Sequence, residues 1–109
     1  MLAVLIVGAG GGLGKALVRE ALSRGAHVSV LVRSSAKYAS ENADVTGRIT
    51  VHEGSGSDPA AVALAATSSS VGVVLGCMGG DAGFARGIAE GAARAGIKKL
   101  VGVSVPAAR

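Results

Sequence analysis

The sequence is poor in aromatic residues. Its 109 residues contain no Trp, one Tyr and one Phe, although half of the residues are hydrophobic. A core with so few aromatic rings has to come from closely packed Val, Leu, Ile and Ala, which is typical of a parallel sheet buried between helices. The shortage also argues against single-stranded nucleic acid as a partner, because proteins that bind it stack the bases on aromatic side chains.

The single cysteine, Cys77, excludes an intrachain disulfide and favours a reducing, cytoplasmic compartment. The apolar run at residues 1–7 is too short to cross a bilayer, and it lacks the charged leader of a signal peptide. His27 and His52 are too isolated for a metal site. The net charge of +4 is read as a basic cofactor site on an ordinary surface. We therefore expect one small domain without a membrane, nucleic-acid or metal partner.

Strand-like and helix-like segments alternate along the chain, which predicts a βαβ architecture. Strands are expected at residues 2–7, 27–32, 48–53, 71–75 and 99–105. Helices are expected at about 12–24, at about 59–66 and after Asp81, with a weakly helical crossover at 34–44. Gly25 and Gly96 end helices, and Asp58 with Pro59 begins one. The simplest right-handed arrangement is a three-layer, Rossmann-like α/β fold, a doubly wound parallel sheet of about five strands in the order 3-2-1-4-5.

Five glycines occupy the seven positions from Gly8 to Gly14, between the first strand and the first helix. Backbone N–H groups at a helix N-terminus bind phosphate when no side chain blocks its approach. In the spacing Gly8-x-x-Gly11-x-x-Gly14, the first glycine makes the turn, the second admits a pyrophosphate and the third lets the helix pack on the sheet. Leu13 excludes the fingerprint with glycines at the first, third and sixth positions. The alternative is a flexible turn that binds nothing.

The end of the second strand lacks the acid that usually bonds the ribose 2′-hydroxyl of NAD. It reads Val32-Arg33-Ser34-Ser35, with no acid before Glu41. A guanidinium can hold a 2′-phosphate in a forked geometry, with hydroxyls completing the pocket and Lys37 assisting. The sequence therefore predicts NADP(H) over NAD(H). The alternative is that Arg33 simply leaves the strand into solvent, as many surface arginines do.

Residues 4–33, with the three glycines and the Leu-Val-Arg-Ser ending, resemble the atypical short-chain dehydrogenase/reductase family, especially its NmrA-like NAD(P)H-binding proteins. The likeness continues less specifically through residues 51–54, 74–76 and 97–104, and so covers nearly the whole chain. It implies an NAD(P)H cofactor, and with Arg33 at the end of the second strand the predicted cofactor is NADP, with NAD possible. The residues predicted to contact the cofactor are Gly8, Gly10, Gly11, Gly12, Leu13, Gly14, Arg33, Ser34, Ser55, Gly76 and Cys77.

The chain departs from this family at two places. Family members often have Asp after the glycine that follows the third strand, where this chain has Gly54-Ser55, so adenine recognition by this residue is in doubt. The reductases use a Tyr-x-x-x-Lys pair after the fifth strand, but the sole tyrosine is Tyr38. Ser104 matches a serine of the family, yet a hydroxyl without Tyr and Lys cannot act on a carbonyl as acid or base. No catalytic residue is predicted, and Cys77 is expected to be a small buried residue.

The leading hypothesis is a single NAD(P)-binding Rossmann domain over residues 1–109, without the family's C-terminal substrate region. It would serve as a nucleotide-binding or redox-sensing module. One alternative is a shortened or fragmentary NADP-dependent oxidoreductase or epimerase whose catalytic residues lie beyond Arg109, and another is an interaction protein with a vestigial site. Whether the chain is an enzyme is left open. The apolar strand at 99–105 would form an edge, which predicts homo-oligomers or poor solubility.

Overall fold

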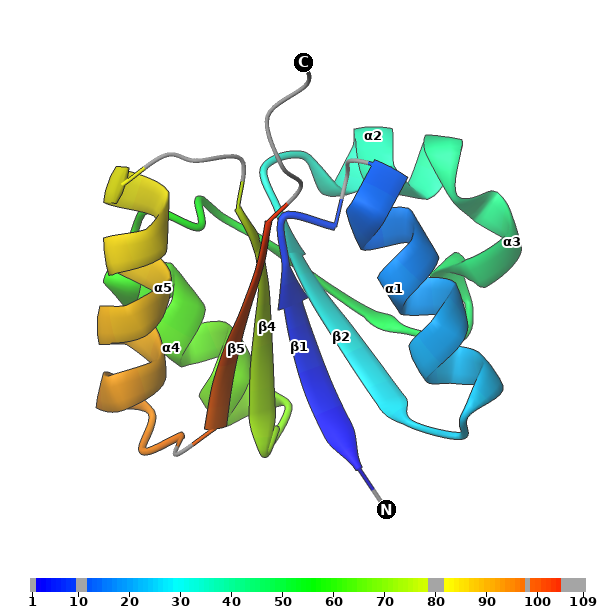
Figure 1. Ribbon diagram of the computed structural model, residues 1–109. Helices are drawn as coiled ribbons and strands as arrows, with labels where there is room; N and C mark the ends of the chain where they lie inside the picture. The colour runs from blue at the N-terminus through cyan, green and yellow to red at the C-terminus, as the bar shows by residue number, and fades with distance from the viewer. Residues whose placement is uncertain (1, 10–11, 79–81, 98, 105–109) are drawn as a thin grey trace.

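A twisted parallel sheet with helices on both faces forms the framework of the protein (Figure 1). The structure, a computed structural model, describes residues 2–9, 12–78, 82–97 and 99–104. The described strands are β1 (Ala3–Val7), β2 (His27–Val32), β3 (Thr50–Glu53), β4 (Val73–Met78) and β5 (Lys99–Ser104). They pair in parallel in the order β3-β2-β1-β4-β5. The predicted Rossmann-like doubly wound fold is confirmed, with β1 at its centre.

The helices divide between the two faces of the sheet (Figure 1). One face carries α1 (Gly12–Ser23), α2 (Ser35–Glu41) and α3 (Ala43–Thr46), and the other carries α4 (Pro59–Ser68) and α5 (Ala82–Arg94). Successive side chains of a strand point to opposite faces. Val4 and Ile6 of β1 therefore belong to the core beneath α1. Leu5 and Val7 belong to the core beneath α4 and α5, so β1 is buried on both sides.

The helix boundaries follow the predicted signals. The Asp58 carboxylate accepts a hydrogen bond from the Ala60 N–H at 3.1 Å, and Pro59 is the first residue of α4. Gly25 and Gly96 follow α1 and α5 with φ of 80° and 75°, in the left-handed region that favours glycine. Helix α4 continues to residue 68, two residues beyond its expected end. In the described part of the chain, no helix is long and apolar enough to cross a membrane.

The expected end of the fourth strand was wrong. We expected this strand at residues 71–75, with a turn from Gly76 onward and Cys77 just after the strand, but β4 runs from 73 to 78. Gly76 and Cys77 pair with residues 102 and 103 of β5, so the ladder continues through them. Pairing with a neighbouring strand overrides the weak strand preference of small residues. The polar crossover at 34–44 contains two short helices, and Asp81 and Val105 lie outside the described residues.

Candidate cofactor-binding site

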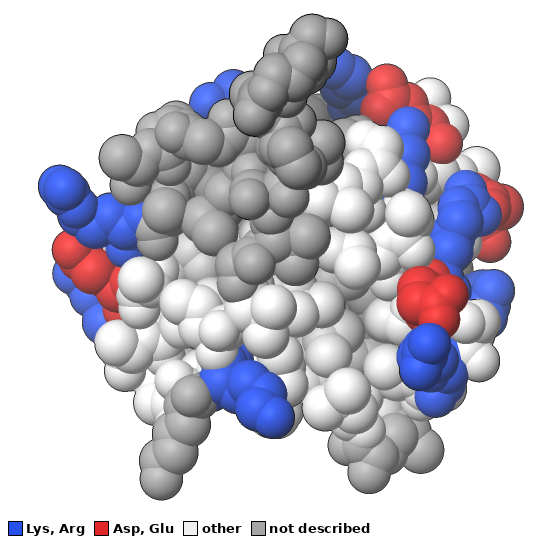
Figure 2. Space-filling view, viewed as in Figure 1, with Lys and Arg blue, Asp and Glu red and all other residues white. Residues whose placement is uncertain are grey.

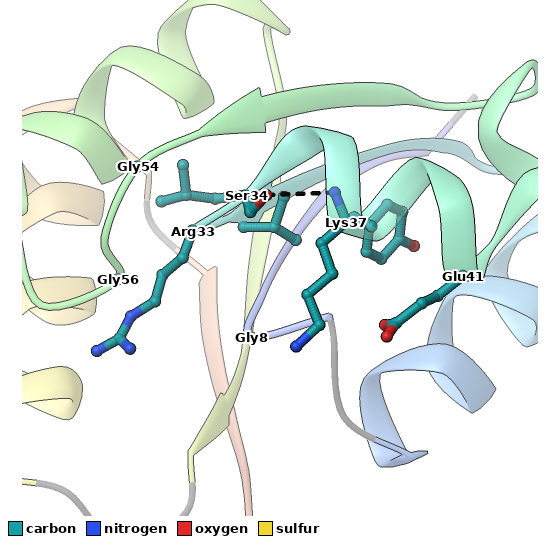
Figure 3. Close-up of a pocket in the computed structure, with 10 residues that line it drawn as sticks. Gly8, Arg33, Ser34, Lys37, Glu41, Gly54 and Gly56 are labelled. Atoms are coloured by element: carbon teal, nitrogen blue, oxygen red, sulfur yellow. Dashed lines mark hydrogen bonds between the residues drawn. The ribbon is translucent and has the colours of Figure 1, made fainter.

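A cavity of about 350 Å³ opens beyond the carboxyl ends of β1, β2 and β3 (Figure 3). Ligands of doubly wound sheets bind beyond these strand ends, where the strand order reverses. In this sheet the order reverses at β1, which lies between β2 and β4. The residues that line the cavity are Gly8, Leu31, Val32, Arg33, Ser34, Lys37, Tyr38, Glu41, Gly54 and Gly56. The cavity thus occupies the position that this fold offers to a ligand.

The glycine turn after β1 is shaped by two different requirements. Gly8 follows β1 directly and has a φ of 83°, a conformation that residues with a side chain rarely adopt. Gly14 lies in the first turn of α1, where an added Cβ would be 2.5 Å from Ala9 Cα and 2.7 Å from the Gly8 carbonyl oxygen. The helix therefore packs on the backbone of the turn itself. The contact places the first turn of α1 against Gly8, which lines the cavity.

The other residues predicted around the turn lie at or beside it. Gly12 is the first residue of α1, and an added Cβ would meet no atom within 4 Å, so this position is open. Leu13 is half-buried. Gly76 is buried in β4 and pairs with Val7, the residue before Gly8. Two predicted residues lie outside the described ones: Gly10 and Gly11. Cys77 is in β4, but the structure does not describe its side chain.

Two cationic side chains flank the cavity at the end of β2. Arg33 follows β2, and Lys37 lies in the first turn of α2. Both side chains are exposed and extend to the same side of the cavity, with Lys37 between Arg33 and Glu41 (Figure 3). The Ser34 hydroxyl oxygen accepts a hydrogen bond from the Lys37 N–H at 3.2 Å and so caps α2. Its hydroxyl hydrogen can still be donated to a ligand.

An acid that the sequence reasoning missed lies beside these residues. Glu53, the last residue of β3, accepts hydrogen bonds at Oε1 from the Ser35 N–H and the Ser35 hydroxyl, both at 2.9 Å. These bonds hold the pKa of the Glu53 carboxyl below its usual value. The two residues are 18 positions apart, and only the pairing of β2 with β3 brings them together. The only sign of this contact in the sequence was the position of an acidic residue at the end of the third strand.

The turn after β3 closes another side of the cavity. Gly54 and Gly56 line it, and an added Cβ on Gly87 of α5 would be 2.6 Å from the Gly56 carbonyl oxygen. Helix α5 therefore supports the turn by close packing. The Ser55 hydroxyl lies 2.7 Å from the Ser57 hydroxyl. Ser55 thus takes part in the structure of the turn, and its contact with a cofactor stays a prediction.

Tyr38 forms a buried wall of the cavity, and its side chain is only 3% exposed. Its hydroxyl has no hydrogen-bond partner among the described residues, and burial raises the pKa of this phenol. The nearby ion pair between Arg19 and Asp44 joins α1 to α3. The hydrogen bond from Arg19 is the main cause that lowers the pKa of Asp44. Tyr38 itself belongs to the core cluster that also contains Val18 of α1 and Val45 of α3.

The two histidines lie away from this cavity, beside a groove at the amino ends of β2 and β3. His27 is exposed, and His52 Nε2 lies 2.8 Å from the Ser69 hydroxyl oxygen. The described residues contain no group of three His, Cys, Asp or Glu residues that could hold a metal ion. The pairing of β2 with β3 thus places both histidines beside the same groove, which their spacing in the sequence did not indicate.

Solved reductases and epimerases share this fold. The anaerobillin reductase ChuY from Escherichia coli O157:H7 is 26% identical, with a TM-score of 0.75 over 92% of this chain and 49% of that one. A short-chain dehydrogenase/reductase from Veillonella parvula DSM 2008 in complex with NADP is 23% identical, with a TM-score of 0.79 over 96% and 48%. A UDP-glucose-4-epimerase from Stenotrophomonas maltophila with bound NAD is 16% identical, with a TM-score of 0.79 over 94% and 36%.

The chain spans about half of the first two proteins and about a third of the epimerase. No curated protein matches its sequence. A family model described as NAD(P)H-binding matches residues 8–109, which include the glycine turn and the residues that line the cavity. The predicted resemblance to the nucleotide-binding part of short-chain dehydrogenases/reductases is confirmed. This chain belongs to the NAD(P)H-binding family.

Proposed function

We propose that the cavity at the end of β2 binds the 2′-phosphate of NADP(H), so that the chain prefers NADP(H) to NAD(H). The observation that supports this proposal is the presence of Arg33 and Lys37 beside one cavity. An arginine forms two parallel hydrogen bonds to a phosphate, and a lysine adds a point charge. Glu41 is the single carboxylate among the described lining residues, so the lining carries a net positive charge.

The rest of the dinucleotide would follow the carboxyl ends of the strands toward β4. We place its pyrophosphate at the glycine turn, where the N-terminus of α1 offers N–H groups and a positive dipole end. The left-handed conformation of Gly8 and the open space at Gly12 support this placement. Gly76 and Cys77 would then lie toward the nicotinamide. The residues proposed to contact the cofactor are those predicted from the sequence, together with Lys37.

Titration of the full chain with NADPH and with NADH, followed by nicotinamide fluorescence, tests the proposal. One charge-assisted contact is worth about 1.5 to 3 kcal/mol, so NADPH is expected to bind at least about tenfold more tightly. Arg33→Asp reverses the charge at the cavity and is expected to abolish this preference. Arg48→Asp is the matched control, because it makes the same change on an exposed residue before β3, at the opposite end of the sheet.

Three outcomes would contradict the proposal. A ratio of NADPH to NADH dissociation constants that Arg33→Asp leaves unchanged would show that this arginine does not contact the 2′-phosphate. Equal effects of the Arg33 and Arg48 variants on this ratio would show that the net charge of the protein, and not a contact with Arg33, causes the preference. The absence of a saturable signal at millimolar cofactor would exclude nucleotide binding altogether.

We propose that residues 1–109 form one NAD(P)-binding domain of NmrA-like type, acting as a nucleotide-binding or redox-sensing module. The observation that supports a binding role for this part is the cavity beside the glycine turn, because residues 1–109 hold no Tyr-x-x-x-Lys pair: Asn42 stands four residues after Tyr38. The single cysteine favours a cytoplasmic location. A redox sensor has to bind NADPH and NADP⁺ with different affinities, which the same titration measures. Equal dissociation constants for the two forms would contradict the sensing role.

The second candidate is the nucleotide-binding part of an NADP-dependent oxidoreductase or epimerase. The observation that favours it is the set of structural neighbours, which includes reductases and epimerases about twice as long as this chain or longer. Sequencing the encoding DNA beyond the codon for Arg109 separates the candidates. An open frame with Tyr-x-x-x-Lys would support the enzyme, and a stop codon would contradict it.

We also propose that the chain forms homo-oligomers through β5. In the described part of the chain, β5 pairs only with β4, and Leu100 and Val101 are 41% and 40% exposed. Figure 2 shows many of the Lys, Arg, Asp and Glu side chains gathered at the sides of this view, over the helices. An apolar edge strand with unpaired backbone groups is a surface for strand pairing with a second copy.

A further inference from the structure

The turn that carries Arg33 is held by a carboxylate from the neighbouring strand. Ser35 is the first residue of α2, where a backbone N–H has no partner within the helix. Glu53 provides that partner, and the same oxygen, Oε1, also accepts the Ser35 hydroxyl. A negative charge at a helix N-terminus is further favoured by the helix dipole. Glu53 therefore caps α2 from another strand, while the Ser34 side chain caps it locally.

This tie is made by the residue that lies between the two cations in the sequence. Arg33 precedes Ser35 by two residues, and Lys37 follows it by two. On the other side of Arg33, the Val32 carbonyl accepts a hydrogen bond from the Gly54 N–H at 2.8 Å. The segment between residues 32 and 35 is thus attached to the end of β3 at both of its ends. A change at Glu53 releases one of these attachments without removing either cation.

We propose that Glu53 is a positioning residue of the 2′-phosphate subsite, and that it strengthens the binding of NADPH over NADH by holding the turn between β2 and α2. The inference rests on the proposed NADP preference. The 2′-phosphate is the only group that distinguishes the two cofactors, so a turn that positions Arg33 and Lys37 acts on NADPH selectively. NADH lacks this phosphate, so it gains less from the positions of the two cations.

A carboxylate also repels a phosphate, and this effect has the opposite sign. Glu53 is exposed and is not among the described residues that line the cavity, so water and salt screen its repulsion. Positioning acts through the chain itself and is not screened. We therefore expect positioning to outweigh repulsion. Glu41 offers the comparison, because it is a carboxylate that lines the cavity directly.

The test uses the full chain and compares dissociation constants for NADPH and NADH. Glu53→Ala is expected to weaken NADPH binding about tenfold, the factor that corresponds to 1.4 kcal/mol. NADH binding is expected to change less than about threefold, because NADH lacks the phosphate that the two cations would contact. Glu53→Gln keeps an oxygen that accepts from Ser35, so it is expected to restore most of the NADPH affinity. Glu41→Gln removes the carboxylate that lines the cavity, so the loss of repulsion is expected to tighten NADPH binding. The matched control, Glu90→Gln, removes an exposed carboxylate of α5 outside this lining and is expected to leave NADPH binding unchanged.

A double-mutant cycle and amide exchange separate positioning from a general loss of structure. Ser35→Ala removes one of the two donors to Glu53, so the effects of Ser35→Ala and Glu53→Ala on NADPH binding are expected to be non-additive. In the cofactor-free protein, the Ser35 amide is expected to exchange faster in Glu53→Ala than in the wild type, with unchanged exchange in β1. Additive effects, or unchanged exchange at Ser35, would overturn the inference.

The remaining outcomes distinguish this inference from the proposed function. Tighter NADPH binding by Glu53→Ala would show that repulsion dominates, and equal weakening of both cofactors would show a structural role only, so either result overturns the inference. If Arg33→Asp abolishes the NADPH preference while Glu53→Ala leaves it intact, the proposed function stands and the inference fails. A wild-type chain that does not prefer NADPH overturns both.

Discussion

Gly14→Ala is the sharpest test of how the glycine turn is built. The substitution adds one methyl group to the first turn of α1. That Cβ would lie 2.5 Å from Ala9 Cα and 2.7 Å from both the Ala9 carbonyl carbon and the Gly8 carbonyl oxygen. Favourable contacts between carbon atoms are about 3.5 to 4.0 Å. All three neighbours are backbone atoms, so no side-chain rotation can relieve the overlap, and the helix has to move away from the turn.

The expected loss follows from two opposing effects. Forcing an extra carbon into a closely packed site costs about 1 to 3 kcal/mol. Alanine has a better helix propensity than glycine, by up to about 1 kcal/mol in a helix interior and less in its first turn. The free energy of unfolding is therefore expected to fall by about 1 to 2 kcal/mol. Displacement of the helix N-terminus also predicts weaker binding of both NADPH and NADH, because the pyrophosphate is common to them.

Urea denaturation followed by circular dichroism measures the stability loss, with Gly12→Ala as the matched control. Gly12 begins the same helix, but an added Cβ there has no atom within 4 Å. Neither glycine has a positive φ, so backbone strain does not enter the comparison. Gly12→Ala is expected to change the free energy of unfolding by less than about 1 kcal/mol. If Gly14→Ala is as stable as Gly12→Ala, the close packing of α1 on the turn is refuted.

Three further predictions concern stability and assembly. The hydrogen bonds from Ser35 lower the pKa of Glu53 below its ordinary value of 4.5 in the folded state. Their contribution to the free energy of unfolding is therefore complete above pH 4.5 and is lost as the pH falls through the lowered pKa. The stability advantage of the wild type over Glu53→Gln in urea denaturation is therefore expected to shrink as the pH falls, and a constant difference would contradict this. Tyr38→Phe removes a buried hydroxyl without a described partner, so the free energy of unfolding is expected to stay unchanged or to rise by about 1 kcal/mol, and a clear decrease would show that the hydroxyl has a partner. Val101→Lys is expected to reduce the apparent mass in light scattering, whereas a wild-type chain that is monomeric at high concentration would exclude self-association through β5.

Local patterns were sufficient to predict the framework. Gly8 and Gly25 were expected to make a turn and to end a helix, and both adopt the left-handed conformation that only glycine enters without strain. Asp58 was expected to begin a helix and does so with a hydrogen bond to a backbone N–H of its first turn. The strand order followed from the right-handed connections between strands of a parallel sheet. Each of these signals involves neighbouring residues or a general rule of chain connection.

Only those residues of the site that directly follow a strand could be predicted from the sequence. Arg33 and Gly8 were placed correctly at the ends of β2 and β1, and both line the cavity. The burial of Tyr38 and the tie between Ser35 and Glu53 were not foreseen, since they depend on which helices and strands lie beside α2. The residue pattern within one segment does not indicate which other segments will pack against it.

The sequence alone thus determined the doubly wound sheet, the glycine turn and the basic end of the second strand, because these depend on backbone conformation and on the spacing of residues close in the chain. The tertiary structure alone decided that Gly76 lies inside β4 and that Glu53 accepts the hydrogen bonds of Ser35 beside Arg33. These contacts join segments from different elements, and hydrogen bonds and packing between them form only when strand pairing has brought the segments together.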